Sequence, residues 1–171
     1  PTVTRDVIVA DRTAPAITLT GAANINIEQG AVYSESGATA TDTIDGDVSA
    51  SIVIGGAVNT SVPGTYVLTY NVSDAVGNAA AQVTRTVVVA DQTAPVITLN
   101  GSNPIDHEVN TIFTDPGASA TDNIDGNISS SIGVSGTVNA GAVGSYILTY
   151  NVSDSSGNAA ATVTRPVTVA D

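Results

Sequence analysis

Aspartate is the residue type that dominates the chemistry open to this chain. Of its 16 acidic residues, 13 are Asp, and most lie in short segments rich in Gly, Asn and Thr that are typical of turns. Two of these segments, TDTIDGD and SDAVGN, return 80 residues later as TDNIDGN and SDSSGN. Carboxylate and amide oxygens on irregular loops are the ligands that calcium accepts. The aspartates are therefore the first candidates for a metal site.

Few other residues are suited to chemistry. There is no Cys, Met or Trp, and the single histidine is His107, which excludes thiolate catalysis, disulfides and Cys-based zinc sites. Ile27 occupies the equivalent position 80 residues earlier, so we expect His107 at an ordinary surface position and expect no enzymatic activity. A net charge of −12, with four arginines and no lysine, argues against nucleic-acid binding. No apolar run approaches the roughly 18 residues of a membrane span, so we expect no direct membrane insertion.

A repeat with a period of 80 residues organises the chain. Residues 11–90 and 91–170 align without a gap, which predicts two copies of one module, over 11–90 and 91–171. Residues 1–10 match 81–90 and 161–170, and we interpret them as the last strand of a preceding repeat. Without a sheet of its own, this strand is expected to fray or to pair with another chain or domain. The sequence is therefore interpreted as part of a longer array.

The composition favours strands over helices. Hydrophobic residues make up 42% of the chain and aromatic residues only 4%, so the core must consist mainly of Val, Ile, Leu and Ala. Alternating segments separated by Gly, Asn, Asp and Pro are typical of short strands. They predict strands in the first repeat at 16–20, 24–28, 38–41, 51–54, 65–73 and 80–90, and again 80 residues later.

The last two predicted strands of each repeat carry residues that bear on packing. Tyr66 and Tyr70 share the core-facing side of the fifth strand, and Tyr66 follows Gly64 where sandwich proteins often carry a tyrosine corner. Arg85 has the same parity as the valines of the last strand, which directs it inward. We expect this arginine to lie along the edge of the sandwich, paired with a carboxylate.

Three longer motifs occur in both repeats: D-x-TAP-x-ITL, GA-x-ATD-x-IDG and LTYNVSD-x-x-GNAA-x-x-VTR. As a set they resemble the tandem immunoglobulin-like domains of bacterial surface and secreted proteins. The resemblance covers both repeats end to end and implies an all-β fold of two tandem immunoglobulin-like β-sandwiches in an elongated array. It also implies an extracellular or cell-surface location, with a spacer or adhesive role rather than one enzymatic activity.

In such a sandwich, the start of the module, the TDTIDGD loop and the final hairpin share one end. Four carboxylates within several ångströms would repel one another by a few kcal/mol, so we expect a divalent cation there, and Ca²⁺ suits irregular oxygen ligands best. Asp47 and Asn127 are the weakest candidates, because the turn can direct them outward. The alternative is an acidic rim solvated by water and monovalent ions. The predicted ligands are Asp11, Asp42, Asp45, Asp74 and Asn78 in the first copy and Asp91, Asp122, Asp125, Asp154 and Asn158 in the second.

Asp91 lies directly between the two repeats, with no Gly/Ser-rich linker. An ion held there would stiffen the junction, and Glu35 is expected to reach it from the first copy as a further ligand. The predicted function is a non-catalytic extracellular spacer of a bacterial surface protein, stiffened by calcium, whose partners are neighbouring repeats. Two alternatives stay open: an adhesive module that binds a cell-surface glycan or a protein receptor, and a fibre subunit that assembles head-to-tail by strand pairing. The copies differ most at 22–36 and 102–116, where an adhesive surface would be expected.

Overall fold

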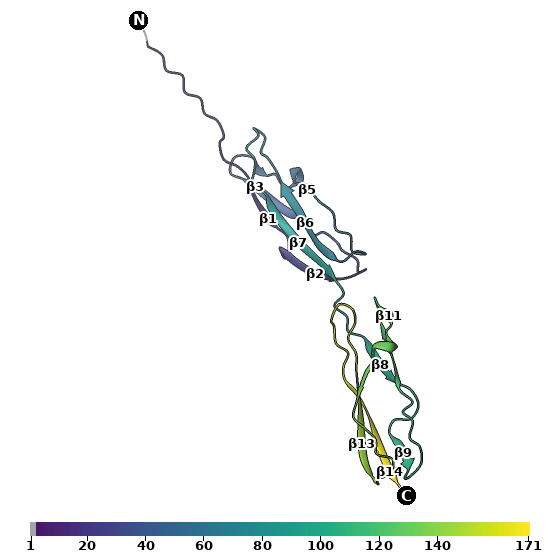
Figure 1. Cartoon of the computed structure of the whole chain (residues 1–171). Coiled ribbons are helices and arrows are strands. Elements are labelled where there is room, and N and C mark those ends of the chain that lie inside the picture. The colour runs from purple at the N-terminus through teal and green to yellow at the C-terminus, as the bar shows by residue number, and fades with distance from the viewer. Residues whose placement is uncertain (1–2) are drawn as a thin grey trace. The chain divides into compact units, whose positions relative to one another are not determined.

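The computed structural model describes residues 3–171. The chain divides into two compact units with the boundary between Ala90 and Asp91, and Figure 1 shows both. Each unit contains one three-stranded and one four-stranded sheet. This is the all-β architecture that the sequence predicts.

The first unit begins with a small sheet in the order β1-β3-β4, formed by Ala16–Leu19, Ala38–Asp42 and Gly46–Asp47. A short 3₁₀ helix, η1, follows at Ser49–Ser51. The larger sheet has the order β2-β7-β6-β5, formed by Asn24–Glu28, Val83–Ala90, Gly64–Asn71 and Val53–Gly55. The chain enters the unit beside β1 and β3 and leaves it at the opposite end, after β7 (Figure 1).

The second unit repeats this arrangement. Its small sheet has the order β11-β10-β8, formed by Gly126–Asn127, Ala118–Asp122 and Val96–Leu99, with η2 at Ser129–Ser131. Its larger sheet has the order β12-β13-β14-β9, formed by Gly133–Ser135, Gly144–Asn151, Val163–Ala170 and Ile105–Glu108. Neighbouring strands in both units are antiparallel, except that β2 runs parallel to β7 and β9 runs parallel to β14.

Most of the predicted strands are confirmed to within a few residues. The segment predicted at 51–54 is partly wrong, because the chain first forms η1 there and β5 begins only at Val53. The Ser49 hydroxyl explains the detour: its Oγ accepts a hydrogen bond of 2.9 Å from the amide of Ala40 in β3, which holds the turn against the small sheet. Residues 3–10 form no strand within the described chain and are exposed, while residues 1 and 2 of the predicted strand lie outside the described residues.

The core of each unit forms from alternating side chains of the two long strands. Leu68 and Tyr70 of β6 and Val87 and Val89 of β7 are all buried. Arg85 lies on the same side of β7 and has no solvent exposure at all. Its predicted place along the edge is therefore wrong, although the predicted carboxylate partner is present, as described below.

The predicted tyrosine corner is present in both units. The hydroxyl of Tyr66 donates a hydrogen bond of 2.8 Å to the carbonyl of Val62, and that of Tyr146 donates one of 2.9 Å to the carbonyl of Ala142. Each bond closes the loop that leads into the long strand β6 or β13. The tyrosine hydrogen bond thus fixes the loop from which β6 or β13 begins.

Candidate metal centre

Each unit gathers three aspartate carboxylates at one place. In the first unit they belong to Asp11, Asp42 and Asp45, and in the second to Asp91, Asp122 and Asp154. Within each set, one oxygen from every residue lies within 4.8 Å of the others. We call these sets the first and second aspartate clusters. All six residues are among the ligands predicted from the sequence.

Asp42 is the most enclosed member of the first cluster. It ends β3, and its Oδ1 accepts hydrogen bonds from the amides of Ile44 at 2.7 Å and Asp45 at 3.1 Å. The residue is only 8% exposed, and its Oδ2 is buried without a hydrogen-bond partner. An anionic oxygen in such a position is costly unless a cation or donor meets it. The turn therefore fixes Oδ1 and leaves Oδ2 available to a cation.

Asp11 also has one oxygen held by its own turn and the other without a hydrogen-bond partner. Its Oδ1 accepts hydrogen bonds from the amide of Thr13 at 2.9 Å and from the hydroxyl of Thr13 at 2.7 Å, while its Oδ2 is buried and unpartnered. Asp45 completes the cluster, and its Oδ2 accepts a hydrogen bond of 2.7 Å from the amide of Ala75 in the final hairpin. The three segments that the sequence brings to one end of the module thus meet there.

Two members of the second cluster, Asp91 and Asp122, are equivalent to Asp11 and Asp42, whereas its third member, Asp154, comes from the final hairpin. Asp122 ends β10, and its Oδ1 accepts hydrogen bonds from the amides of Ile124 at 2.8 Å and Asp125 at 2.9 Å. The Asp125 and Ile124 amides lower the pKa of the Asp122 carboxyl, and its Oδ2 is buried without a hydrogen-bond partner. Asp91 is buried, and its Oδ1 accepts a hydrogen bond of 3.1 Å from the amide of Thr93.

Asp74 and Asp154 accept hydrogen bonds from residues of their own hairpins. Both oxygens of Asp74 accept hydrogen bonds from Asn78, at 2.7 Å from the amide and 2.6 Å from the side chain. Asp154 and Asn158 repeat this pairing at 2.7 and 2.8 Å. Burial raises the pKa of the Asp74 carboxyl, but the bonds from Asn78 and its neighbours outweigh it and lower that pKa. Of the two, only Asp154 joins a cluster.

The remaining loop residues lie outside the clusters. Asp125 accepts hydrogen bonds from the amide and hydroxyl of Ser155, at 2.6 and 2.8 Å, and so ties its loop to the hairpin. Asp47 and Asn127 accept hydrogen bonds from the amides of Ser49 and Ser129, at 2.9 and 3.0 Å. Both of these residues are exposed, as their weak candidacy predicts.

Glu35, which the sequence predicts as a further ligand at the junction, is engaged within the first unit and belongs to neither aspartate cluster. Its carboxylate forms an ion pair with the buried guanidinium of Arg85 and also accepts hydrogen bonds from the hydroxyls of Tyr33 and Tyr70 and the amide of Gly37. Burial raises the pKa of Glu35, but the hydrogen bonds from these four partners lower it to about 2. The carboxylate is therefore already neutralised by a cation of the chain itself.

The second unit contains the same buried pair. Arg165 has no exposure and pairs with Asp115, whose Oδ1 also accepts a hydrogen bond of 2.7 Å from the hydroxyl of Tyr150. Burial and the bond to Asp115 raise the pKa of Tyr150 to about 12. Alternation along the last strand predicts that the arginine points inward, but it does not indicate which carboxylate pairs with it. The available signal was that each arginine follows an acidic residue, Glu35 or Asp115, by 50 positions.

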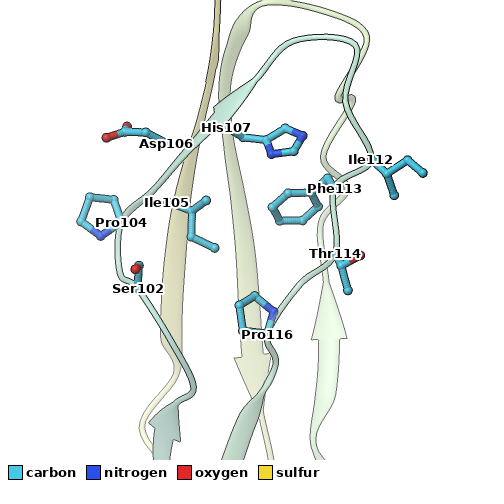
Figure 2. A pocket seen from close by; sticks show the side chains of 9 residues that line it. All are labelled: Ser102, Pro104, Ile105, Asp106, His107, Ile112, Phe113, Thr114 and Pro116. Atoms are coloured by element: carbon cyan, nitrogen blue, oxygen red, sulfur yellow. The ribbon is translucent and has the colours of Figure 1, made fainter.

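A hollow of about 500 Å³ opens in the second unit, between β9 and the segment that follows it (Figure 2). Ile105 and His107 face Phe113 and Pro116 across it, while Asp106 points to the other side of the strand. The rings of His107 and Phe113 meet edge to face, with centroids 5.2 Å apart and planes at 81°. His107 is half-buried, so its predicted place at an ordinary surface position is only partly right.

Residues 17–89 and 97–169 each match the family described as "Bacterial surface protein, Ig-like domain". The chain belongs to this family. An uncharacterized 81.3 kDa protein of Acholeplasma phage L2 is 38% identical over 108 residues, which are 59% of this chain and 14% of that protein. This member of the Ig-like surface family therefore spans a small part of that relative. Within residues 3–171, no helix is long and apolar enough to cross a bilayer.

The chain is also similar to solved structures. The chain is similar to the M60 catalytic domain with the CBM51-1 and CBM51-2 domains from Clostridium perfringens ZmpB, at 14% identity and a TM-score of 0.52 over 92% of this chain and 31% of that one. A lipoprotein from Bacteroides thetaiotaomicron matches at 17% identity and a TM-score of 0.41, over 85% of this chain and 96% of that one. At such identities, the first likeness supports the Ig-like fold and nothing further.

Proposed function

We propose that this chain is a non-catalytic extracellular spacer of a bacterial surface protein, and that Ca²⁺ bound at the two aspartate clusters stabilises its repeats. The family supports the surface location and the repeated sandwich. The observation that carries the metal is the buried, unpartnered Oδ2 of Asp42, which lies in a cluster with two further carboxylates. Uncompensated, three such charges would repel one another and favour unfolding.

The donors suit calcium better than other common metals. All the ligand atoms are oxygens on irregular loops, and within each cluster they lie within 4.8 Å of one another, close enough to bind one ion. Zinc would require His or Cys, and neither is present in a cluster. Magnesium holds its waters and a strict octahedron, so it is expected to bind more weakly. Backbone carbonyls and water would complete the coordination.

The place of Asp91 in the chain gives the second ion a further role. Asp91 directly follows β7, which ends at Ala90, and β8 begins only at Val96. An ion that holds Asp91 to Asp122 and Asp154 would immobilise the first residue after β7. It would therefore shorten the flexible segment between β7 and β8 and limit bending between neighbouring repeats.

Calorimetric titration of the metal-free chain with Ca²⁺ tests the proposal. We expect two sites per chain, one for each cluster. Asp42→Asn should abolish the first and Asp122→Asn the second, because asparagine can still accept the turn hydrogen bonds at Oδ1 but brings no charge. Asp106→Asn is the matched control, since Asp106 is an exposed acidic residue outside both clusters. Absence of binding to the wild-type chain, or equal loss in the control, would contradict the proposal.

A second candidate function is adhesion to a neutral glycan through the hollow around His107. The hollow lies within 102–116, the stretch where the two copies differ most, and His107 is Ile27 in the first copy. Arg165, the only Arg or Lys side chain of the second unit, is buried and paired, which disfavours an anionic ligand. A glycan array should then show binding that His107→Ile removes and that Ile27→Ala leaves unchanged. Absence of any neutral glycan signal would leave only the spacer.

A further inference from the structure

The first strand of the large sheet in each unit runs parallel to the last. In the first unit, β2 pairs with β7 over five consecutive positions, from Asn24 opposite Thr86 to Glu28 opposite Ala90. Two further backbone hydrogen bonds extend the ladder: Thr86 donates to the carbonyl of Ala23 at 2.8 Å, and Gln29 donates to the carbonyl of Ala90 at 3.0 Å. The second strand of the unit, β2, is therefore joined directly to the last, β7.

This pairing fixes how the unit responds to a pull on its ends. Tension from the N-terminal side reaches the start of β2 through β1, and tension from the C-terminal side reaches the end of β7. Because the strands are parallel and the chain enters and leaves at opposite ends (Figure 1), the two pulls slide β2 and β7 past each other along their axes. All the ladder hydrogen bonds then carry the load together instead of breaking one after another.

The buried arginine fastens the same strand at a second level. Arg85 projects from β7, pairs with Glu35 and donates hydrogen bonds to the carbonyls of Thr20, just after β1, and Gly37, just before β3. Sliding β7 would withdraw the buried guanidinium of Arg85 from the carboxylate of Glu35, which is strongly unfavourable. The contact thus ties the last strand to the segments that flank β1 and β3.

The second unit has both devices. β9 runs parallel to β14 from Ile105 opposite Val167 to Glu108 opposite Ala170, and Val109 donates a hydrogen bond of 2.8 Å to the carbonyl of Ala170. Arg165 pairs with Asp115 and donates hydrogen bonds to the carbonyls of Asn100 and Gly117. The sequence of the ladder differs between the units, but its direction and its arginine are kept.

We propose that each repeat is a force-bearing module, in which the parallel ladder and the buried arginine act together as a shear clamp along the array. The clamp rests on the proposed spacer function, because it matters only where neighbours pull on both ends. It does not require calcium, since the ladder and the arginine pair lie outside both aspartate clusters.

Single-molecule pulling of the full chain in two directions tests the clamp. The chain has no cysteine, so Val76→Cys, at an exposed position of the hairpin, gives a unique attachment point. Pulling from both chain ends loads β2 against β7 in shear. Pulling between the N-terminus and position 76 applies both forces at the end where the chain enters the first unit, because Ala75 in that hairpin is bonded to Asp45. We expect the first unit to unfold at a force about twofold or more lower in the second geometry, because its hydrogen bonds then break singly.

A variant tests the role of the arginine pair, and a metal control tests whether calcium affects the unfolding force. Glu35→Gln should lower the end-to-end unfolding force of the first unit only, with the unaltered second unit as an internal reference, and circular dichroism should confirm that the variant is folded. Equal forces in the two directions would overturn the clamp, as would an unchanged force in folded Glu35→Gln. All pulls are repeated with Ca²⁺ and with EDTA: a directional difference that persists without any effect of calcium supports the clamp and contradicts the proposed calcium site.

Discussion

At the scale of single residues, the carboxylates that are partly or fully buried fall into two kinds. Glu35 and Asp115 are neutralised by an arginine of the same unit, and each also accepts a hydrogen bond from a tyrosine hydroxyl. Asp42 has turn amides on one oxygen and no hydrogen-bond partner on the other. The first kind holds the sandwich together, and the second kind is suited to an external cation.

The arginine pair yields a prediction about stability. Glu35→Gln leaves the buried charge of Arg85 without its counter-charge and should lower the free energy of unfolding of the first unit by about 3 kcal/mol at pH 7. Glu35 has a pKa of about 2 in the folded chain, below its ordinary value of 4.5. The stabilisation from its charge is therefore complete above about pH 4.5 and is lost as the pH falls towards 2. Urea denaturation at pH 7 and pH 3 should show a smaller deficit at the lower pH, whereas the exposed control Glu108→Gln should change little at either.

The sequence predicted the cluster aspartates well because turn residues are local. Asp11, Asp42 and Asp45 follow from short motifs whose loops must share one end of an immunoglobulin-like sandwich. The partner of Glu35 could not be predicted, because Arg85 is 50 residues away on β7 and nothing in the loop that carries Glu35 indicates a buried arginine. Asp74 lies outside the first cluster, whereas Asp154, which has the same pairing with an asparagine, belongs to the second.

At the scale of elements, the strands follow from alternation and the connections from special residues. β6 and β7 are long and alternate clearly, so their existence and core faces were predictable. The break at η1 depends on the Ser49 hydroxyl contacting β3, a long-range contact that alternation does not reveal. The parallel direction of β2 beside β7 was also not predicted, because strand order depends on packing between distant segments.

A glycine at the edge of the large sheet gives an element-scale prediction. Gly136 follows β12 with a φ of 91°, and a Cβ there would lie 2.2 Å from the carbonyl oxygen of Ile147 in β13. Gly136→Ala should destabilise the second unit by about 2 kcal/mol or more, from the left-handed backbone and the clash together. Gly157→Ala is the matched control for the backbone alone, since its φ is also 91° and no atom lies within 4 Å of the added Cβ. Thermal unfolding that ranks the two variants equally would contradict this account of Gly136.

At the scale of the whole molecule, the two units share three structural features. One end gathers the carboxylates that we assign to calcium, the middle contains the arginine pair, and the first and last strands of the large sheet run side by side. Two units built alike, in a family of bacterial surface Ig-like domains, agree with the proposed spacer function. The hollow around His107 is the main departure from this likeness.

The most direct test of the central claim is the thermal unfolding of the full chain in Ca²⁺ and in EDTA. Calcium at about 100 times its dissociation constant should stabilise each occupied unit by about 2.7 kcal/mol. For units of this size, that is a rise in Tm of roughly 10 °C or more. The double variant Asp42→Asn/Asp122→Asn should melt at the same temperature in both solutions. If the wild-type chain also shows the same Tm in calcium and EDTA, the aspartate clusters do not hold calcium.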